Sequence, residues 1–232
     1  IWWCVFTLPL VFFLKEKPHP FASVLKRNEP LSLVFKQLVQ SFKKLFKQKP
    51  IFYFLLSYWF YIDGVFTVYT MAVDFGLSIG LQDTDLMKAL LITQFVGFPS
   101  ALIFGKLSEK YHVKTLLLMC LAVYSLVLIF STKLTTGTDF MILAVCVGFV
   151  QGAIQALSRS FYAHLIPENQ KAEYFGFFNI IGKSASFVGP FLVATVTYLT
   201  GNHRLSLLSI TLLFVLGAVF LFKTDMKKEQ EG

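Results

Sequence analysis

Long apolar runs alternate with short polar segments along most of the chain. A helix needs roughly 20 apolar residues to cross the hydrocarbon core of a bilayer, and runs of about this length with few charges recur six times. They cover residues 51–73, 86–104, 115–131, 140–162, 174–199 and 205–222. The pattern predicts an all-α transmembrane protein with six spans in residues 51–222 and a short tail, residues 223–232.

Two further segments precede these runs. Residues 1–14 are apolar but too short to span comfortably, and we interpret them as the end of a truncated transmembrane helix; a short interfacial anchor is the alternative. In residues 15–50, apolar side chains recur at helical spacing from Leu31 to Phe46, with lysines on the other side. Pro30 and Pro50 bound this pattern, which predicts a basic amphipathic linker at the membrane surface. Binding of this helix by a partner protein is the alternative.

The charges predict the orientation in the membrane. Only 15% of the residues are charged, against about 25% in soluble domains. Lys and Arg concentrate in residues 15–49, 106–114 and the tail, and residues 163–173 carry Lys171. The opposite loops, residues 74–85 and 132–139, together contain four Asp against a single Lys. Basic loops remain on the cytoplasmic side, so the linker and the tail are predicted to be cytoplasmic. The net charge of +8 therefore requires no nucleic-acid partner.

Motifs for catalysis or for cofactor binding are absent from the sequence. It contains no HExxH, GxSxG or Walker A motif, and the three cysteines lie in apolar runs, where they are typical packing residues. The four histidines fall in loops without the spacing of metal ligands. We therefore expect no enzyme activity, no cofactor and no metal site.

The loop after the second run carries a recognisable motif. The stretch "GKLSEKYHVK" resembles the signature loop of a major facilitator half, in which a glycine is followed by an acid, a base and a further basic residue. Here these residues are Gly105, Glu109, Lys110 and Lys114. The glycine is expected to allow close helix packing. The sequence departs from the pattern at His112, where the family usually has glycine, and in having Glu instead of the commoner Asp.

Four other stretches are similar to the vacuole-effluxer-like branch of that superfamily, which includes autophagy-related vacuolar amino-acid effluxers and bacterial relatives. They are "YIDGV" (61–65), "GFVQGAIQALSRS" (148–160), "YFGFFNIIGK" (174–183) and "VGP" (188–190). The resemblance implies the six-helix C-terminal half of a major facilitator fold, built as an inverted 3+3 repeat. The N-terminal six-helix half of the same protein is then the expected partner.

The resemblance also implies a function. It implies secondary active transport of a small solute by alternating access, with amino acids as candidate solutes and protons as the expected coupling ion. A non-transporting membrane receptor or scaffold with the same fold is the alternative. Frequent Lys and Phe favour an AT-rich, bacterial genome and hence the bacterial inner membrane; in a eukaryote we expect the vacuolar membrane.

Polar residues inside the apolar runs are the candidate pathway residues. Asp63 lies near the centre of the first run, where a charge costs roughly 2.5–3.5 kcal/mol on insertion scales, so it should face other helices or water. In the family's fold, the first helix of each three-helix repeat lines the central pathway. We therefore expect a polar cluster for a zwitterionic solute, formed by Asp63, Gln94, Gln151, Gln155 and Lys183. A structural ion pair between Asp63 and Lys183, and interhelical hydrogen bonds of the glutamines, are the alternatives.

Other polar and helix-bending residues have two interpretations each. Arg159 either extends to the cytosolic interface or pairs with Glu109 or Glu173; in the family's fold this pairing would be a cytoplasmic latch that involves the signature loop. Substrate contact by Arg159 is the less favoured alternative. Gly64 is expected to allow a bend or a close neighbour, and Gly189 with Pro190 is expected to bend the fifth run, as a gate element or for packing.

Overall fold

The computed structural model describes residue 45 and residues 47–224, which all belong to one compact unit. Its elements are α4 (Lys49–Ser78), α5 (Asp83–Leu107), α6 (Val113–Ser131), α7 (Gly137–Leu165), η1 (Glu168–Gln170), α8 (Lys171–Ser184), α9 (Val188–Thr200), α10 (His203–Ser209) and α11 (Thr211–Phe222). In this part of the chain, six helical segments are long and apolar enough to cross a membrane. The predicted all-α fold with six spans is therefore confirmed. The expectations for residues 1–14, for most of the linker and for the end of the tail lie outside the described residues.

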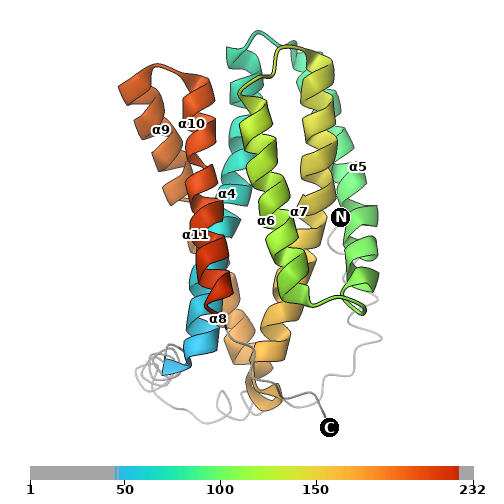
Figure 1. The fold of residues 1–232 in the computed structure, drawn as a ribbon, viewed down its shortest axis with the longest axis vertical. Coiled ribbons are helices and arrows are strands. Elements are labelled where there is room, and N and C mark those ends of the chain that lie inside the picture. The colour runs from blue at the N-terminus through green and yellow to red at the C-terminus, as the bar shows by residue number, and fades with distance from the viewer. Residues whose placement is uncertain (1–44, 46, 225–232) are drawn as a thin grey trace, which may run out of the picture. The chain divides into compact units, whose positions relative to one another are not determined.

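The helix connections alternate between the two ends of the bundle (Figure 1). Residues 108–112 and 166–170 lie at one end, together with the start of α4 and the end of α11. Residues 79–82, 132–136 and 201–202 lie at the other. We call these the inner end and the outer end, because the basic loops that are predicted to be cytoplasmic lie at the first.

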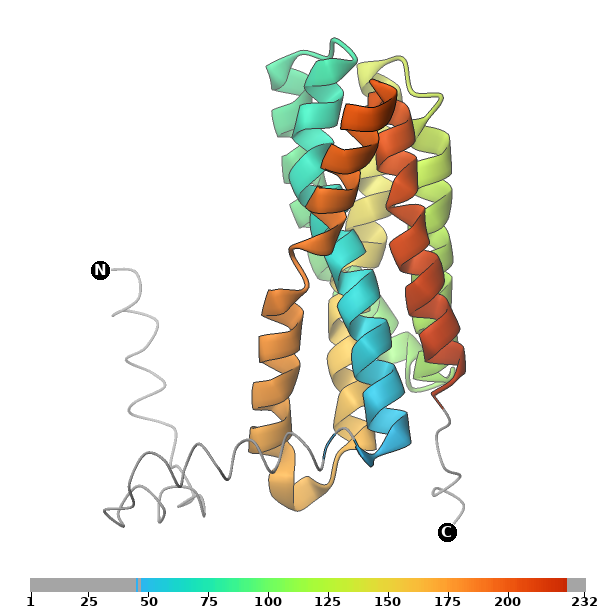
Figure 2. The same cartoon turned by 90° about the vertical axis from the view of Figure 1, so that its left-hand side faces the viewer.

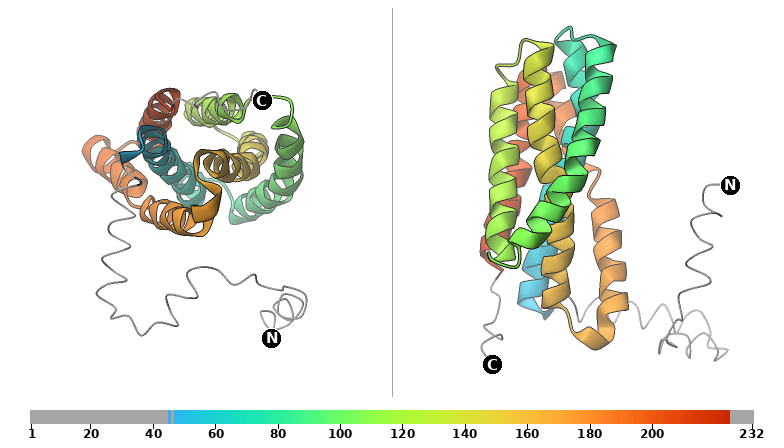
Figure 3. Two further views of the ribbon diagram at one scale, coloured as in Figure 1. Left: turned by 90° about the horizontal axis from the view of Figure 1, so that it is seen from below. Right: turned by 90° about the vertical axis from the view of Figure 1, so that its right-hand side faces the viewer.

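The six spans form two sets of three that run in opposite directions. The first set is α4, α5 and α6, and the second is α7, α8–α9 and α10–α11. Viewed along the bundle, α4 and α7 lie between the outer helices (Figure 3, left). Helix α5 packs against α7, and α8 and α9 pack against α4; likewise α6 packs against α7 and α11 against α4. Each first helix thus contacts the second and third helices of the other set, as in an inverted repeat.

Local sequence sets the turns at the outer end. Helix α7 starts with a capping box, in which Thr136 and Asp139 satisfy each other's backbone N–H groups. The side chain of Asn202 accepts from the backbone of Arg204 at the start of α10. Gly80 and Gly201 have φ values of +84° and +63°, which L side chains rarely adopt, so glycine permits both turns. These signals keep the loops at this end short.

The fifth span was predicted at residues 174–199 with a bend at Gly189 and Pro190, and the structure shows a complete interruption just before these residues. Helix α8 ends at Ser184 and α9 begins at Val188, so the helix is interrupted about midway (Figure 2). Pro190 provides the physical reason, because a proline ring clashes with the carbonyl four residues earlier, here that of Ser186. Pro190 itself lies in the first turn of α9, where its missing N–H costs nothing.

Aromatic side chains fill the inner half between α4, α7 and α8. Tyr58 and Phe178 stack with their ring centroids 4.1 Å apart, and Phe178 also stacks on Tyr162 at 5.0 Å. Phe54 packs on Phe161 and Tyr162. This cluster ties α8 to both central helices.

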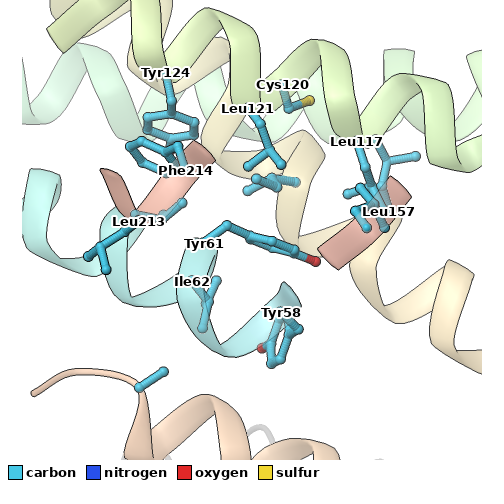
Figure 4. Packing of buried hydrophobic residues seen from close by; sticks show 14 of the residues in the cluster. Tyr58, Tyr61, Ile62, Leu117, Cys120, Leu121, Tyr124, Leu157, Leu213 and Phe214 are labelled. Carbon is cyan, nitrogen blue, oxygen red and sulfur yellow. The ribbon is translucent and has the colours of Figure 1, made fainter. Parts of the chain in front are cut away.

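Farther along, Tyr124 of α6 lies against Phe214 of α11 (Figure 4). The same close-up shows Cys120 and Leu121 on α6 facing the core. Cys120 is fully buried among apolar residues and forms no disulfide, which agrees with its predicted role in packing. The core therefore joins helices of both sets.

Candidate functional site

Asp63 lies on α4 beside the interruption in the fifth span. Its side chain is buried, with 1% exposure, and it is the one charged residue of the described chain in the buried class. Oδ2 accepts a hydrogen bond of 2.9 Å from the backbone N–H of Gly189, the second residue of α9. Asp63 therefore supplies the cap that the start of α9 lacks within its own sequence, and its negative charge lies at the positive end of that helix.

Thr67 completes this contact, one turn farther along α4. Its hydroxyl donates to the carbonyl oxygen of Asp63 at 2.7 Å and lies 3.5 Å from Oδ1 of the same residue. A Cβ atom at Gly189 would lie 1.9 Å from Oγ1 of Thr67 and 3.0 Å from Oδ1 of Asp63. Only glycine fits this position, so the absent side chain is what allows the backbone N–H to reach the carboxylate. We call Asp63, Thr67 and Gly189 the carboxylate clamp.

The other residues of the predicted polar cluster do not gather around Asp63. Lys183 is exposed near the end of α8 and forms no ion pair with Asp63; the adjacent Gly182 packs against Tyr58 instead. The alternative of an Asp63–Lys183 pair is therefore wrong in this conformation. The break at residues 185–187 is the physical reason, because it brings a backbone N–H to the carboxylate in place of an ammonium group.

The three glutamines lie on α5 and α7. Gln94 is exposed and donates to the hydroxyl of Tyr69 on α4 at 3.3 Å, which links two helices of the first set. Gln155 is exposed on α7. Gln151 is partly buried, and its Oε1 has no hydrogen-bond partner among the described residues. Gln94 thus follows the alternative of an interhelical bond.

A polar contact that the sequence did not reveal joins the two central helices. The hydroxyl of Tyr61 on α4 lies 2.7 Å from Oγ of Ser158 on α7, and both residues are buried. Tyr61 points from α4 into the space between the helices (Figure 4). Ser57, one turn earlier on α4, donates to the carbonyl of Gly217 on α11 at 2.6 Å. Tyrosine and serine are common in apolar runs, so the sequence gave no signal for these contacts.

The residues of the predicted latch are separate in this conformation. Arg159 is exposed on α7 and forms no ion pair with Glu109 or Glu173; it lies within electrostatic range of Tyr58. Within residues 47–224 the ion pairs are Lys88–Asp85 and Lys171–Glu168, both at exposed helix starts. The hydrogen bond and the charge of Lys171 hold the pKa of Glu168 below its usual range.

The signature loop contacts the end of the last helix. The ammonium of Lys114 donates to the carbonyl of Phe222, the last residue of α11, at 3.0 Å and to that of Thr224, just after the helix, at 2.9 Å. Cations stabilise helix C-termini, where carbonyls lack partners. Glu109 and Lys110 are exposed in the turn. A Cβ at Gly105 would meet nothing within 4 Å, so the close packing expected at this glycine is not found among the described residues.

A matching contact lies at the outer end. Arg204, the second residue of α10, donates to the carbonyls of Thr132 at 2.6 Å and Leu134 at 3.0 Å, beyond the end of α6. Lys114 is likewise the second residue of α6. Each third span therefore starts with a cation that caps the other third span. This explains why Arg204 departs from the pattern of basic inner loops.

The two glycines predicted to affect helix geometry act differently. Helix α4 continues through Gly64, where a Cβ would lie 3.0 Å from the ring of Phe214. Gly64 thus permits the approach of α11. Gly189 and Pro190 follow a complete interruption of the helix.

Comparison of the sequence with known proteins places the chain in a family. The family described as "Vacuole effluxer Atg22 like" matches residues 1–231. A Bacillus subtilis (strain 168) protein named "Uncharacterized MFS-type transporter YxiO" is 38% identical over 241 residues, which cover 99% of this chain and 54% of that protein. Autophagy-related protein 22-1 of Sclerotinia sclerotiorum is 26% identical over 256 residues, covering 99% of this chain and 43% of the relative. Autophagy-related protein 22 of Yarrowia lipolytica is 27% identical over 261 residues, covering 100% and 44%. The chain thus spans about half the length of these relatives.

Proposed function

The chain belongs to the Atg22-like vacuole effluxer family, and from this premise we propose that it is the C-terminal half of a secondary active transporter. In this proposal the protein moves a small solute across the membrane by alternating access. Residues 1–14 end the sixth helix of the whole protein, residues 15–50 form the cytoplasmic linker, residues 51–222 form the second half, and residues 223–232 form a cytoplasmic tail. Six apolar helices and relatives named as a transporter and as autophagy-related proteins support the proposal.

The carboxylate clamp is the observation that carries this function. Discontinuous helices near the middle of the membrane commonly form the solute and ion sites of transporters, because the interruption frees backbone groups and helix ends. Here the interruption at residues 185–187 meets Asp63, a buried carboxylate without a cationic partner. We propose that a carboxylate in such a place takes up and releases a proton. We assign the coupling proton to Asp63.

The remaining polar residues within the spans are proposed to line the passage. Gln94, Gln155 and Lys183 expose their side chains on apolar helices, where polar groups need water or a partner. Gln151 adds a carbonyl oxygen without a hydrogen bond. An amino acid would suit such a lining, because amides and an ammonium group bind its carboxylate. Arg159 and the acids Glu109 and Glu173 are proposed to pair as a latch in another access state.

The N-terminal six-helix half is the proposed partner of the exposed apolar helices. Phe95 and Phe98 on α5, Phe187 just before α9 and Phe191 on α9 are each more than 60% exposed. The relatives have about as much sequence again as this chain. We propose that the two halves enclose the passage, in the cell membrane of a bacterium.

The test is transport by the full-length protein in liposomes, with and without a pH gradient, using a mixture of labelled amino acids. We expect accumulation driven by the gradient, and its loss by at least about tenfold in Asp63→Asn, which keeps the size of the side chain. Asp74→Asn is the matched control, because Asp74 is an exposed acid on the same helix. Solute binding without transport would support the receptor alternative, and unchanged accumulation in Asp63→Asn would overturn the assignment of the proton.

A further inference from the structure

Helices α9 and α10 form a hairpin at the outer end. Residues 185–187 interrupt the fifth span before α9. At Ile210, between α10 and α11, the backbone keeps a helical conformation, with φ −61° and ψ −26°, so the sixth span has no comparable break there. Figure 2 shows that a short non-helical segment connects α8 to α9. The hairpin, residues 188–209, is thus joined to α8 at a point where the backbone can change direction, whereas its α10 arm continues into α11. We call it the outer hairpin.

Packing holds the two halves of the fifth span to very different degrees. Helix α8 buries Tyr174, Phe177, Phe178 and Gly182 against the central helices. In α9, which is nearly as long, Gly189 is the one residue in the buried class. In a bilayer, close van der Waals packing and interhelical hydrogen bonds hold helices together. Helix α9 also packs against α10 and places the partly buried Val188, Leu192 and Val193 against the core. It is thus less deeply buried than α8, and its one residue in the buried class is the one that bonds to Asp63.

Two polar contacts fasten the outer hairpin, one at the start of α9 and one next to the turn between α9 and α10. At the start of α9, Asp63 accepts the N–H of Gly189. At the start of α10, Arg204 donates to the carbonyls of Thr132 and Leu134. The second contact does not involve a group that loses its charge, because arginine stays protonated in proteins. Only the first contact can be changed by a proton.

We propose that the outer hairpin is a gate whose α9 arm is held against α4 by the charged carboxylate of Asp63 and is released when that carboxylate binds a proton. The proposal rests on the proposed function and adds which part of the molecule the proton moves. A hydrogen bond from N–H to a carboxylate is roughly twice as strong as one to a neutral acceptor. A negative charge also interacts favourably with the N-terminus of a helix. Protonation removes both contributions, while Arg204 keeps α10 in place as the pivot.

Few other ionisable groups face this contact. On the elements packed against α4, the ionisable residues nearest to Asp63 in span position are Lys183 on α8 and Arg159 on α7, both exposed. Tyr198 of α9, and His203 and Arg204 of α10, lie toward the outer end, and α11 contains no ionisable residue. The proton-dependent change is therefore assigned to Asp63.

The experiment measures distances by paired spin labels in the full-length protein, in lipid nanodiscs without solute and with the native cysteines replaced. One pair joins Tyr198 on α9 to Leu126 on α6, and the control pair joins Ile180 on α8 to Leu126; all three side chains are exposed. Between pH 8 and pH 5 we expect the first distance distribution to broaden and shift by several ångströms. The control pair should not change. Joint movement of both pairs would overturn the proposal, because it would mean that the fifth span moves as one helix.

Variants separate the proton from other effects of pH. Asp63→Ala should give the released distribution at both pH values, and Asp63→Asn should give a single distribution that no longer depends on pH. Asp74→Asn should respond like the wild type. A pH response that persists in Asp63→Asn would overturn the gate. Lost transport in Asp63→Asn with wild-type distances would overturn the gate alone, whereas a pH-dependent gate in a protein that transports no solute would overturn the proposed function alone.

Discussion

Two helix contacts that the inverted repeat makes equivalent are built from different chemistry. In one, α5 of the first set packs on α7; in the other, α9 of the second set packs on α4. At the first contact, a Cβ at Gly152 would lie 2.1 Å from the carbonyl oxygen of Gly97, and one at Gly148 would lie 2.7 Å from that of Thr93. The obstacles are backbone atoms. At the second contact, a Cβ at Gly189 would meet side-chain atoms.

The hydrogen bonds differ in the same way. Across α5 and α7, the hydroxyl of Thr93 donates to the carbonyl of Ala144 at 3.2 Å and that of Ser100 donates to the carbonyl of Phe149. These neutral bonds do not change with pH. Across α4 and α9, the bond is made by an ionisable carboxylate. The same topological position thus holds a permanent contact in one set and a contact that a proton can alter in the other.

The largest effect is expected from Gly152→Ala. Its Cβ would overlap the backbone of Gly97, so α5 and α7 must separate along their length, at a cost of about 1–3 kcal/mol. We expect a lower melting temperature and less folded full-length protein in detergent. The control is Gly176→Ala on α8, where a Cβ meets nothing within 4 Å and where alanine favours the helix. Equal melting temperatures for the two variants would contradict the close backbone contact.

Gly189→Ala should have a smaller effect on stability and a large one on transport. The new Cβ would collide with Oγ1 of Thr67, which is a side-chain atom. A second substitution can remove this side chain, whereas no substitution can remove the backbone that blocks a Cβ at Gly152. We expect transport to fall by at least about tenfold, because the N–H of residue 189 no longer reaches Asp63. The second substitution Thr67→Ala should restore part of the activity. No rescue in the double variant would show that the two contacts are alike in rigidity.

Removal of the cations at the starts of the third spans should have a moderate effect. Lys114→Gln and Arg204→Gln each leave two helix-end carbonyls without their charged donor, for which we expect a loss of about 1 kcal/mol of stability. Lys114→Arg should keep the stability of the wild type, since a guanidinium group also donates to carbonyls. Additive losses in the double variant would agree with two separate contacts at opposite ends. The measurement is thermal unfolding of the full-length protein.

The smallest effect is expected at the exposed pair Lys171–Glu168, which belongs to neither contact. Because the folded pKa of Glu168 is lowered, its contribution to stability is present above the ordinary value of 4.5 and is lost as the pH falls through the folded value. Between pH 5 and pH 8, Lys171→Ala should therefore leave the pH dependence of the melting temperature unchanged. A clear change in this range would mean that the pair matters more than an exposed ion pair normally does.

The positions of the spans could be read from the sequence because membrane helices require long apolar runs, a property of composition. The importance of Asp63 was likewise visible, since a charge in such a run is costly wherever it points. Its partner was not, because the partner is a backbone N–H, and every residue except proline has one. The sequence instead offered Lys183, as a member of the predicted polar cluster or, in the alternative, as an ion-pair partner, but Lys183 lies on the other side of the break.

Small side chains were equally hard to assign. Gly189 was predicted to bend a helix, and Pro190 does account for the interruption, but the fit of Gly189 against Thr67 depends on which helix lies opposite. Gly105 is part of a recognisable motif, yet a Cβ added there would meet nothing within 4 Å in the described chain. The contacts of Lys114 and Arg204 depend on helix ends that only the packed structure brings together. Tertiary proximity, not residue type, decides these roles.

The bond between Asp63 and Gly189 has a consequence for how the protein is made. The two residues are 126 positions apart, so at a synthesis rate of about 5–20 residues per second the acid leaves the ribosome roughly 6–25 seconds before its partner exists. During that interval α4 must enter the bilayer while the carboxylate of Asp63 lacks its hydrogen bond from Gly189, and an unpaired charge disfavours insertion. We therefore expect α4 to be inserted less stably in nascent chains that stop before the fifth span than in longer chains. Synthesis of the last spans would then stabilise the membrane insertion of the first span.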